Sequence, residues 1–315
     1  MIPHHTILDS IGNTTLLPLR HLVPKGSAGI LLKLENENPT GSMKDRMALS
    51  MIETPEFEGR LADGAAVVEY TGGSTGVSLS LVCAVKGHPL HIVTSDAFSK
   101  EKLDHMRILG AKLEIIPSVG GGMTEKLTKD MIARAGVIAQ ETGAYWTDQM
   151  KNQDQLPAYR RLAEELWTQT EGKIDAFVQF VGTGGSLRGT AEGLKRHNEH
   201  IRVFAVEPAE SPVLSGGKSG AHKIDGVGAG FVVPMWKPDL VERVLQVSTA
   251  EAMAMALRLA REEGLFAGTS TGGNVVAALR VAQSLGEGAT VVTLMVDSGM
   301  KYLKKFGEAV ESGSR

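Results

Sequence analysis

Three short loops rich in small residues stand at junctions between apolar, strand-like runs and helix-like segments of this chain. Each loop contains three glycines, which let a backbone turn tightly and approach a ligand closely. A helix that follows such a loop directs N–H groups and the positive end of its dipole toward an anion. One such loop is common in ordinary proteins, whereas three in one chain favour a ligand site. The loops are residues 71–76, 182–186 and 268–273.

Strand-like and helix-like segments alternate from about residue 65 onward. Such alternation predicts parallel sheets covered by helices on both faces, and therefore an α/β fold. Because a domain holds roughly 100–200 residues, the 315 residues suggest about two domains. The expected strands are 65–70, 90–94, 113–116, 176–181, 202–206 and 290–296, and the expected helices are 77–86, 99–109, 124–141, 155–170, 187–197, 250–263 and 274–285.

Composition excludes several classes of protein. With 33 basic and 36 acidic residues, the chain lacks the basic excess of a protein that binds nucleic acid through its phosphates. We see no run of about 18 apolar residues to cross a membrane and no secretory signal, so we expect a cytoplasmic protein. The lone Cys83 cannot form a disulfide within the chain, and we expect its thiol to be buried. The histidines show no metal-binding spacing, so no metal site is expected.

Two common nucleotide-binding motifs are incomplete. A dinucleotide fingerprint beginning at Gly182 requires a glycine where Leu187 stands. A P-loop that includes Lys218 requires a glycine where Pro212 stands. Neither NAD nor ATP is therefore supported as a ligand.

A third phosphate-bearing ligand, pyridoxal phosphate, requires a lysine amine. Residues 38–46 read Asn-Pro-Thr-Gly-Ser-Met-Lys-Asp-Arg and place Lys44 just inside an expected helix. Pro39 and Gly41 set a turn, and Ser42 can cap the helix. Because most lysines near a helix start lie on the surface, this spacing alone does not assign a function to Lys44.

Taken together, these segments resemble the cysteine synthase / cystathionine β-synthase family of fold-type II pyridoxal phosphate enzymes over nearly the whole chain. The resemblance implies two α/β domains like those of the tryptophan synthase β-subunit, with a substrate cleft between them, in a homodimer. The smaller domain would be residues 45–147, with the substrate-carboxylate loop. The larger would be residues 1–44 plus 148–315, with the phosphate loop. The motifs that carry the resemblance are residues 11–16, 38–46, 182–186, 207–208, 211–217, 222–231, 268–272 and 297–299.

The resemblance also implies roles for individual residues. Lys44 would bind the aldehyde of the cofactor covalently and then act as the acid and base. Ser270 would hydrogen-bond the pyridine nitrogen, and Ser74 would contact both cofactor and substrate. The phosphate would be bound by Gly182, Thr183, Gly184, Gly185 and Ser186. The substrate carboxylate would be bound by Thr71, Gly72, Ser74, Thr75 and Gln149.

The carboxylate loop departs from the family's usual Thr-Ser-Gly-Asn-Thr-Gly. Here it reads Thr-Gly-Gly-Ser-Thr-Gly, so that Gly72 removes a hydroxyl and Ser74 replaces an asparagine. One lost charge-assisted hydrogen bond costs roughly 1.5–3 kcal/mol, enough to change substrate choice without abolishing cofactor binding.

The resemblance implies an enzyme that replaces the β-substituent of an O-activated serine, such as O-acetylserine, with sulfide or another thiol. One alternative is net β-elimination, as in a cysteine desulfhydrase or amino-acid deaminase, which the altered loop favours. The other is a catalytically silent family member that binds a partner.

Overall fold

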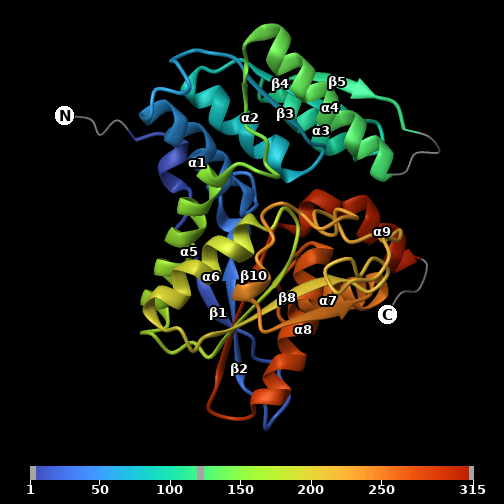
Figure 1. The fold of residues 1–315 in the computed structure, drawn as a ribbon. Helices are drawn as coiled ribbons and strands as arrows, with labels where there is room; N and C mark the ends of the chain where they lie inside the picture. The colour runs from blue at the N-terminus through green and yellow to red at the C-terminus, as the bar shows by residue number, and fades with distance from the viewer. Residues whose placement is uncertain (1–4, 119–123, 312–315) are drawn as a thin grey trace. The chain divides into compact units, whose positions relative to one another are not determined.

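The computed structural model describes residues 5–118 and 124–311 (Figure 1). Contacts divide the chain into two units. The first comprises the N-terminal residues up to Ile11 together with Asn38–Ala158, and the second comprises Gly12–Glu37 together with Tyr159 onward.

The first unit contains a four-stranded parallel sheet in the order β5-β4-β3-β6. The chain moves from β3 to β4 to β5 and then returns to the other side of β3. Right-handed crossovers therefore place α2 and α3 on one face and α4 on the other. Every residue of β3 is buried, as covering on both faces requires. The elements are α1 (Lys44–Phe57), β3 (Val67–Tyr70), α2 (Ser74–Lys86), β4 (Leu90–Ser95), α3 (Lys100–Ile108), β5 (Lys112–Ile116), α4 (Glu125–Thr142) and β6 (Tyr145–Trp146).

Apolar side chains on one face of this sheet pack against α4. Val68, Tyr70 and Val93 of β3 and β4 form a buried cluster with Leu127 and Met131 of α4. On α4 the buried positions recur as Leu127, Met131, Ala135 and Ile138. This spacing of three to four residues places them on one helical stripe facing the sheet.

The second unit contains a six-stranded sheet in the order β1-β2-β10-β7-β8-β9. All neighbouring pairs are parallel except β1 and β2, which are antiparallel. Figure 1 shows α5 and α6 on one side of this sheet and α7 and α8 on the other. The elements are β1 (Leu16–Pro18), β2 (Gly29–Leu34), α5 (Leu156–Gln169), β7 (Ala176–Phe180), α6 (Gly185–His197), β8 (Arg202–Pro208), β9 (Arg243–Val247), α7 (Thr249–Glu262), α8 (Thr269–Leu285), β10 (Thr290–Met295) and α9 (Leu303–Glu311).

Short 3-10 helices occur in both units. They are η1 (Ile7–Ser10), η2 (Glu35–Glu37), η3 (Gln153–Gln155), η4 (Pro238–Leu240) and η5 (Gly299–Tyr302).

The α/β fold with two sheets of mostly parallel strands is confirmed, and each expected segment corresponds to an observed one. Three helices begin two or more residues earlier than expected, α2 at Ser74, α6 at Gly185 and α8 at Thr269, because glycines and hydroxyl residues of the loops form their first turns. The sequence pattern did not predict β1, β2, β6 or β9. The antiparallel β1 is a three-residue edge strand, too short to show a periodicity.

The contacts divide the chain at different residues from those expected for the domains. Residues 38–44 belong to the first unit because the side chain of Asp45 accepts the backbone N–H of Thr40 (2.7 Å). Residues 148–158 also belong to it, since Ser50 of α1 donates its hydroxyl to the carbonyl of Asp154 (2.5 Å).

Candidate active site

Most of the predicted site residues, though not Lys44 or Ser270, follow strands at the places where strand order reverses. In the first unit the chain continues from β3 to β4 on one side, while β6 lies on the other. In the second unit it continues from β7 to β8 on one side, while β10 lies on the other. Ligands of open α/β sheets bind beyond the carboxyl ends of strands at such points. Residues 71–75 follow β3, Gln149 follows β6, and residues 182–186 follow β7.

Hydrogen bonds join the loop after β3 to the segment after β6. The hydroxyl of Thr75 donates to Oε1 of Gln149 (2.8 Å), and Nε2 of Gln149 donates to the carbonyl of Tyr70 (2.9 Å). The hydroxyl of Thr71 accepts the N–H of Gly73 (3.1 Å), which closes the turn before α2. Gly73 carries no side chain to cap the first N–H groups of α2. The first unit therefore brings the predicted carboxylate-binding residues together at one uncapped helix N-terminus.

A buried carboxyl group in β3 is hydrogen-bonded to the segment that follows β6. Glu69 in β3 is fully buried, and its Oε2 accepts the hydroxyl of Thr147 (2.6 Å) and the backbone N–H of Gln149 (3.0 Å). Its Oε1 accepts the N–H of Tyr70 (2.8 Å). Burial raises the pKa of Glu69 to about 8, against the lowering effect of these hydrogen bonds. Glu69 thus fixes the backbone of Gln149 relative to β3.

Lys44 is the first residue of α1 and is half-buried. Its backbone N–H donates to the hydroxyl of Ser42 (3.2 Å), but the N-cap position is Met43, which makes no side-chain capping bond, so Ser42, the expected cap, lies one residue before it. The neighbouring Asp45 is fully buried and accepts hydroxyl hydrogen bonds from Thr40 and from Ser78 of α2 (both 2.5 Å). Asp45 therefore ties the first turn of the lysine helix to the helix that follows the carboxylate loop.

The loop after β7 in the second unit requires or favours glycine at two of the positions predicted to bind phosphate. A Cβ atom on Gly182 would lie 2.5 Å from the carbonyl oxygen of Gly226, so only glycine fits there. Gly184 is the N-cap of α6 with φ +87°, a left-handed conformation that favours glycine, and it makes no capping hydrogen bond. Ser186 in the first turn accepts a hydrogen bond from Nε2 of Gln179 in β7 (2.6 Å).

The start of α8 packs beside the same end of the sheet. Oδ1 of Asn274 accepts the N–H of Phe180 (2.6 Å), and its Nδ2 donates to the carbonyl of Leu294 (3.0 Å), which fixes α8 against β7 and β10. Ser270 lies one turn earlier and is 2% exposed.

These residues fit pyridoxal phosphate. A helix N-terminus reached over a glycine turn suits a phosphate group, although the hydroxyl of Thr183 accepts the N–H of Gly185 at 3.4 Å. A hydroxyl such as that of Ser270, a residue that is 2% exposed, can form a hydrogen bond with a ring nitrogen. The structure places Gly182–Ser186 and Ser270 in the second unit and Lys44 in the first.

Comparison with known proteins identifies the family. The family model described as "Pyridoxal-phosphate dependent enzyme" matches residues 7–297. The chain belongs to this family.

Several relatives within the pyridoxal-phosphate dependent enzymes are similar over almost their whole length. A cysteine synthase from Staphylococcus aureus is 39% identical over 307 residues, which cover 96% of each protein. The crystal structure of O-acetylserine sulfhydrylase isoform 3 from Entamoeba histolytica is 36% identical with a TM-score of 0.89, covering 96% of this chain and 90% of that one. A hydrogen sulfide-producing enzyme from Fusobacterium nucleatum is 36% identical with a TM-score of 0.87, covering 95% of this chain and 97% of that one. The chain is thus an enzyme of fold type II, and its family depends on pyridoxal phosphate.

Sequence reasoning missed Glu69, Asn274 and Phe98; the ring of Phe98 lies where a side chain on Gly72 would lie. A glutamate inside the buried run Val-Val-Glu-Tyr was a visible signal, because a charged residue in a fully buried strand requires partners. Asn274 and Phe98 carried no comparable signal, since their contacts are with residues distant in sequence.

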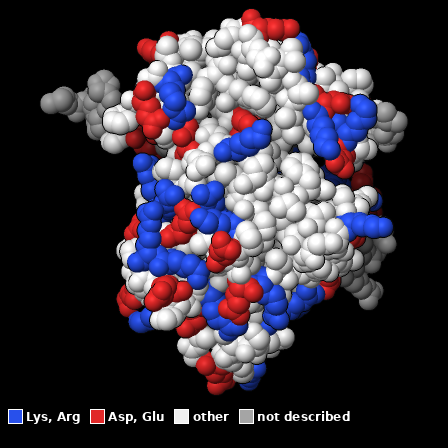
Figure 2. Space-filling model, in the orientation of Figure 1, with Lys and Arg blue, Asp and Glu red and all other residues white. Residues whose placement is uncertain are grey.

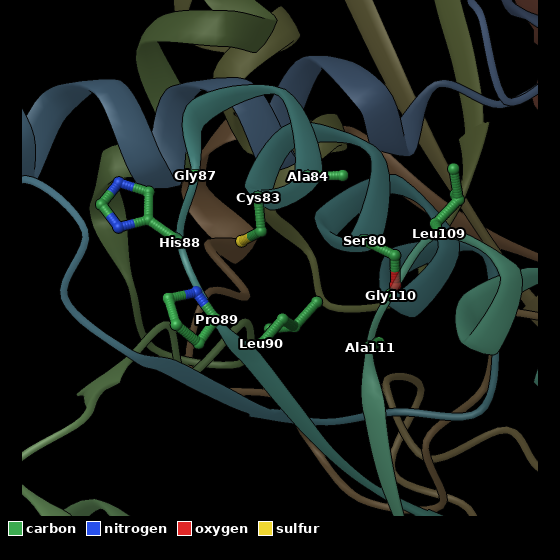
Figure 3. A pocket seen from close by; sticks show the side chains of 10 residues that line it. All are labelled: Ser80, Cys83, Ala84, Gly87, His88, Pro89, Leu90, Leu109, Gly110 and Ala111. Carbon is green, nitrogen blue, oxygen red and sulfur yellow. The ribbon is translucent and has the colours of Figure 1, made fainter.

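A separate cavity of about 220 Å³ lies at the opposite ends of the strands in the first sheet, away from the predicted site. It is formed by the ends of α2 and α3 and the start of β4 (Figure 3). It is lined by Cys83, Gly87, His88 and Gly110 among others, and by none of the predicted site residues. Cys83 is buried as expected, and burial raises the pKa of its thiol to about 12. The thiol therefore stays protonated and unreactive at neutral pH.

Charges on the face shown in Figure 2 are mixed, and acidic side chains lie among the basic ones over α5 and α6. Glu192 pairs there with both Arg160 (2.6 Å) and Arg188 (2.8 Å), so that one carboxylate is shared by two guanidinium groups. Within residues 5–118 and 124–311, no cluster of three or more His, Cys, Asp or Glu residues could hold a metal. None of the helices in these ranges has the length and apolarity needed to cross a membrane.

Proposed function

We propose that this chain replaces the β-substituent of an O-activated serine, such as O-acetylserine, with sulfide or another thiol. The observation that supports this most strongly is its 39% identity to a cysteine synthase across 96% of both proteins. An O-acetylserine sulfhydrylase of closely similar fold supports the same reaction class.

Lys44 is proposed as the residue that binds the cofactor and moves the proton. Pyridoxal phosphate, when bound, supplies a conjugated ring that stabilises negative charge at the α-carbon of an amino acid. The amine of Lys44 would take the α-proton and return a proton during turnover. Asp45, held by Thr40 and Ser78, would keep the helix start in place while it does so.

The remaining predicted residues would bind and orient. Gly182, Thr183, Gly184, Gly185 and Ser186 would hold the phosphate through loop and helix N–H groups. The hydroxyl of Ser270 would bond the ring nitrogen, and as a neutral group it would leave that nitrogen largely unprotonated. Thr71, Gly72, Ser74, Thr75 and Gln149 would bind the substrate carboxylate, with Ser74 also contacting the cofactor.

The test is spectroscopic and then chemical. The purified protein should absorb visible light through its bound cofactor, and the band should shift when O-acetylserine is added. Addition of sulfide should restore the band and release cysteine. A protein that stays colourless with added pyridoxal phosphate would overturn the cofactor assignment. A coloured protein that ignores O-acetylserine would overturn the substrate.

A second candidate is net β-elimination that releases pyruvate and ammonia. The Gly72 and Ser74 departures support it, as does the similarity to a hydrogen sulfide-producing enzyme. Product analysis separates the two, because replacement yields a thiol or thioether amino acid. A silent family member that only binds a partner would show the cofactor band without turning over any β-substituted amino acid.

The family resemblance leads us to propose further that the protein is a cytoplasmic homodimer. Sedimentation analysis should then give a mass twice the 33.5 kDa of one chain. A single-chain mass at micromolar concentration would contradict the dimer.

A further inference from the structure

Helix α9 is anchored within the second unit by its apolar face. Phe306 is buried and forms an apolar cluster with Ala256 and Leu257 of α7. Its ring also meets the ring of Phe266 edge to face, with 5.3 Å between the ring centres. Because Phe306 fixes the helix, the side chain of the preceding residue, Lys305, extends from a backbone that is held in place.

Lys305 binds a segment that lies 80 residues earlier in the chain. Its Nζ donates to Oδ2 of Asp225 (2.5 Å) and to the backbone carbonyl of Lys223. The two side chains of the ion pair are 28% and 35% exposed, so the pair by itself contributes little to the stability of the fold. It does, however, join this segment to α9 at two points.

Residues 222–228 pack against the loop that is predicted to bind phosphate. A Cβ atom on Gly182 would lie 2.5 Å from the carbonyl oxygen of Gly226, so the two backbones are in close contact. The N–H of Gly228 donates to the carbonyl of Val181 (3.1 Å), the residue before the loop. The loop after β7 is therefore supported on this side by a segment that contains neither helix nor strand.

The same segment contacts the start of α8. The backbone N–H of Asp225 donates to the hydroxyl of Thr269 in the first turn of that helix (3.4 Å). The ring of His222 closes the segment on itself, since Nε2 lies 3.0 Å from the carbonyl of Gly228 and Nδ1 accepts the N–H of Ile224 (3.3 Å). The segment thus touches both parts of the second unit that are predicted to bind the cofactor.

We propose that Lys305 is a positioning residue for the phosphate of the cofactor. It holds residues 222–228 in place from α9, and these residues hold the loop 182–186 in the conformation that receives the phosphate. This inference rests on the proposed function, since it requires that the loop binds pyridoxal phosphate. Loss of the Lys305 amine would loosen the loop without removing any group that is predicted to bind the cofactor.

Equilibrium dialysis of the holoenzyme tests this role. Lys305→Met removes the charge and keeps most of the side-chain length, and the dissociation constant of pyridoxal phosphate should rise about threefold to tenfold. The constant for pyridoxal, which lacks the phosphate, should change much less. Lys304→Met is the matched control, because Lys304 is the exposed neighbour on the same helix, and it should change neither constant. Equal weakening of both ligands in Lys305→Met, or no weakening of either, would overturn the inference.

Hydrogen exchange of the holoenzyme tests the contact itself. The backbone amides of residues 222–228 should exchange about threefold faster or more in Lys305→Met, because local opening no longer breaks the contacts of the lysine. Unchanged exchange there would overturn the inference. Failure of the unsubstituted protein to turn over O-acetylserine would instead count against the proposed function alone, because neither measurement depends on turnover. A protein that does not bind pyridoxal phosphate would overturn both.

Discussion

The side-chain oxygen Oε2 of Glu69 accepts the backbone N–H of Gln149 at 3.0 Å, although Glu69 lies in a central strand with no exposed surface. The same oxygen lies 2.6 Å from the hydroxyl of Thr147, which is also 3.4 Å from the carbonyl of Val68. When Glu69 is protonated, its carboxyl group can donate to Thr147, and Thr147 can donate to Val68. In this network a neutral carboxyl group has an acceptor for its proton, and every hydroxyl has an acceptor for its own.

This network makes stability depend on pH in a defined direction. The pKa of Glu69 is raised from 4.5 to about 8, so between these values the folded protein binds more protons than the unfolded chain. The free energy of unfolding must then fall as pH rises from 4.5 to 8, by at most about 1.4 kcal/mol per pH unit from this group.

Glu69→Gln should remove that dependence. At pH 5 the variant should be less stable by about 1–3 kcal/mol, because an amide nitrogen in the place of Oε2 can donate to Thr147 but cannot accept the Gln149 N–H as the carboxyl oxygen does. The deficit should shrink toward pH 8, where only the original protein carries the buried charge. Urea unfolding of both proteins at several pH values measures the difference. A deficit that grows with pH would contradict the raised pKa.

Lys44→Ala should abolish the covalently bound cofactor band and lower turnover by about 10²–10⁴-fold, the usual contribution of a general acid and base. The absorbance of the protein measures the cofactor band, and a cysteine assay measures turnover. Lys126→Ala provides the control, since this lysine is exposed on α4 and pairs with Asp130. Unchanged cofactor binding and turnover in Lys44→Ala would refute the role of Lys44.

Thr75→Val should weaken substrate binding more than it slows the chemistry. The hydroxyl that donates to Gln149 at 2.8 Å is lost, while the volume of the side chain is kept. One such hydrogen bond is worth about 0.5–1.5 kcal/mol, so KM should rise roughly twofold to tenfold with kcat less affected. Thr128→Val on the exposed side of α4 should leave KM unchanged. A fall in kcat alone would show that Thr75 acts in another way.

Gly182→Ala should weaken cofactor binding and destabilise the protein by about 1–3 kcal/mol. The new Cβ atom would lie 2.5 Å from a backbone carbonyl, which cannot move as a flexible side chain can. Titration of the apoprotein with pyridoxal phosphate and thermal melting measure the two effects. Gly307→Ala is the matched control, because a Cβ there meets no atom within 4 Å and alanine favours helix. Equal behaviour of the two variants would show that the loop tolerates a side chain.

The sequence by itself determined the alternation of strands and helices, the three glycine loops and the lysine motif. These features are local: a strand period, a turn that needs glycine or a helix start depends on residues close together in the chain. The order of the strands was not visible in this way, and neither was the antiparallel β1.

Tertiary structure alone decided which of these local features support one another. Phe98 covers Gly72, Glu69 fixes Gln149, and Asn274 joins two strands to α8, each across at least 20 residues of chain. Such contacts depend on which strands are neighbours in the sheet, because neighbouring carboxyl ends bring distant loops together. The departure at Gly72 therefore looked in the sequence like the simple loss of a hydroxyl. In the fold it is the space that an aromatic ring fills.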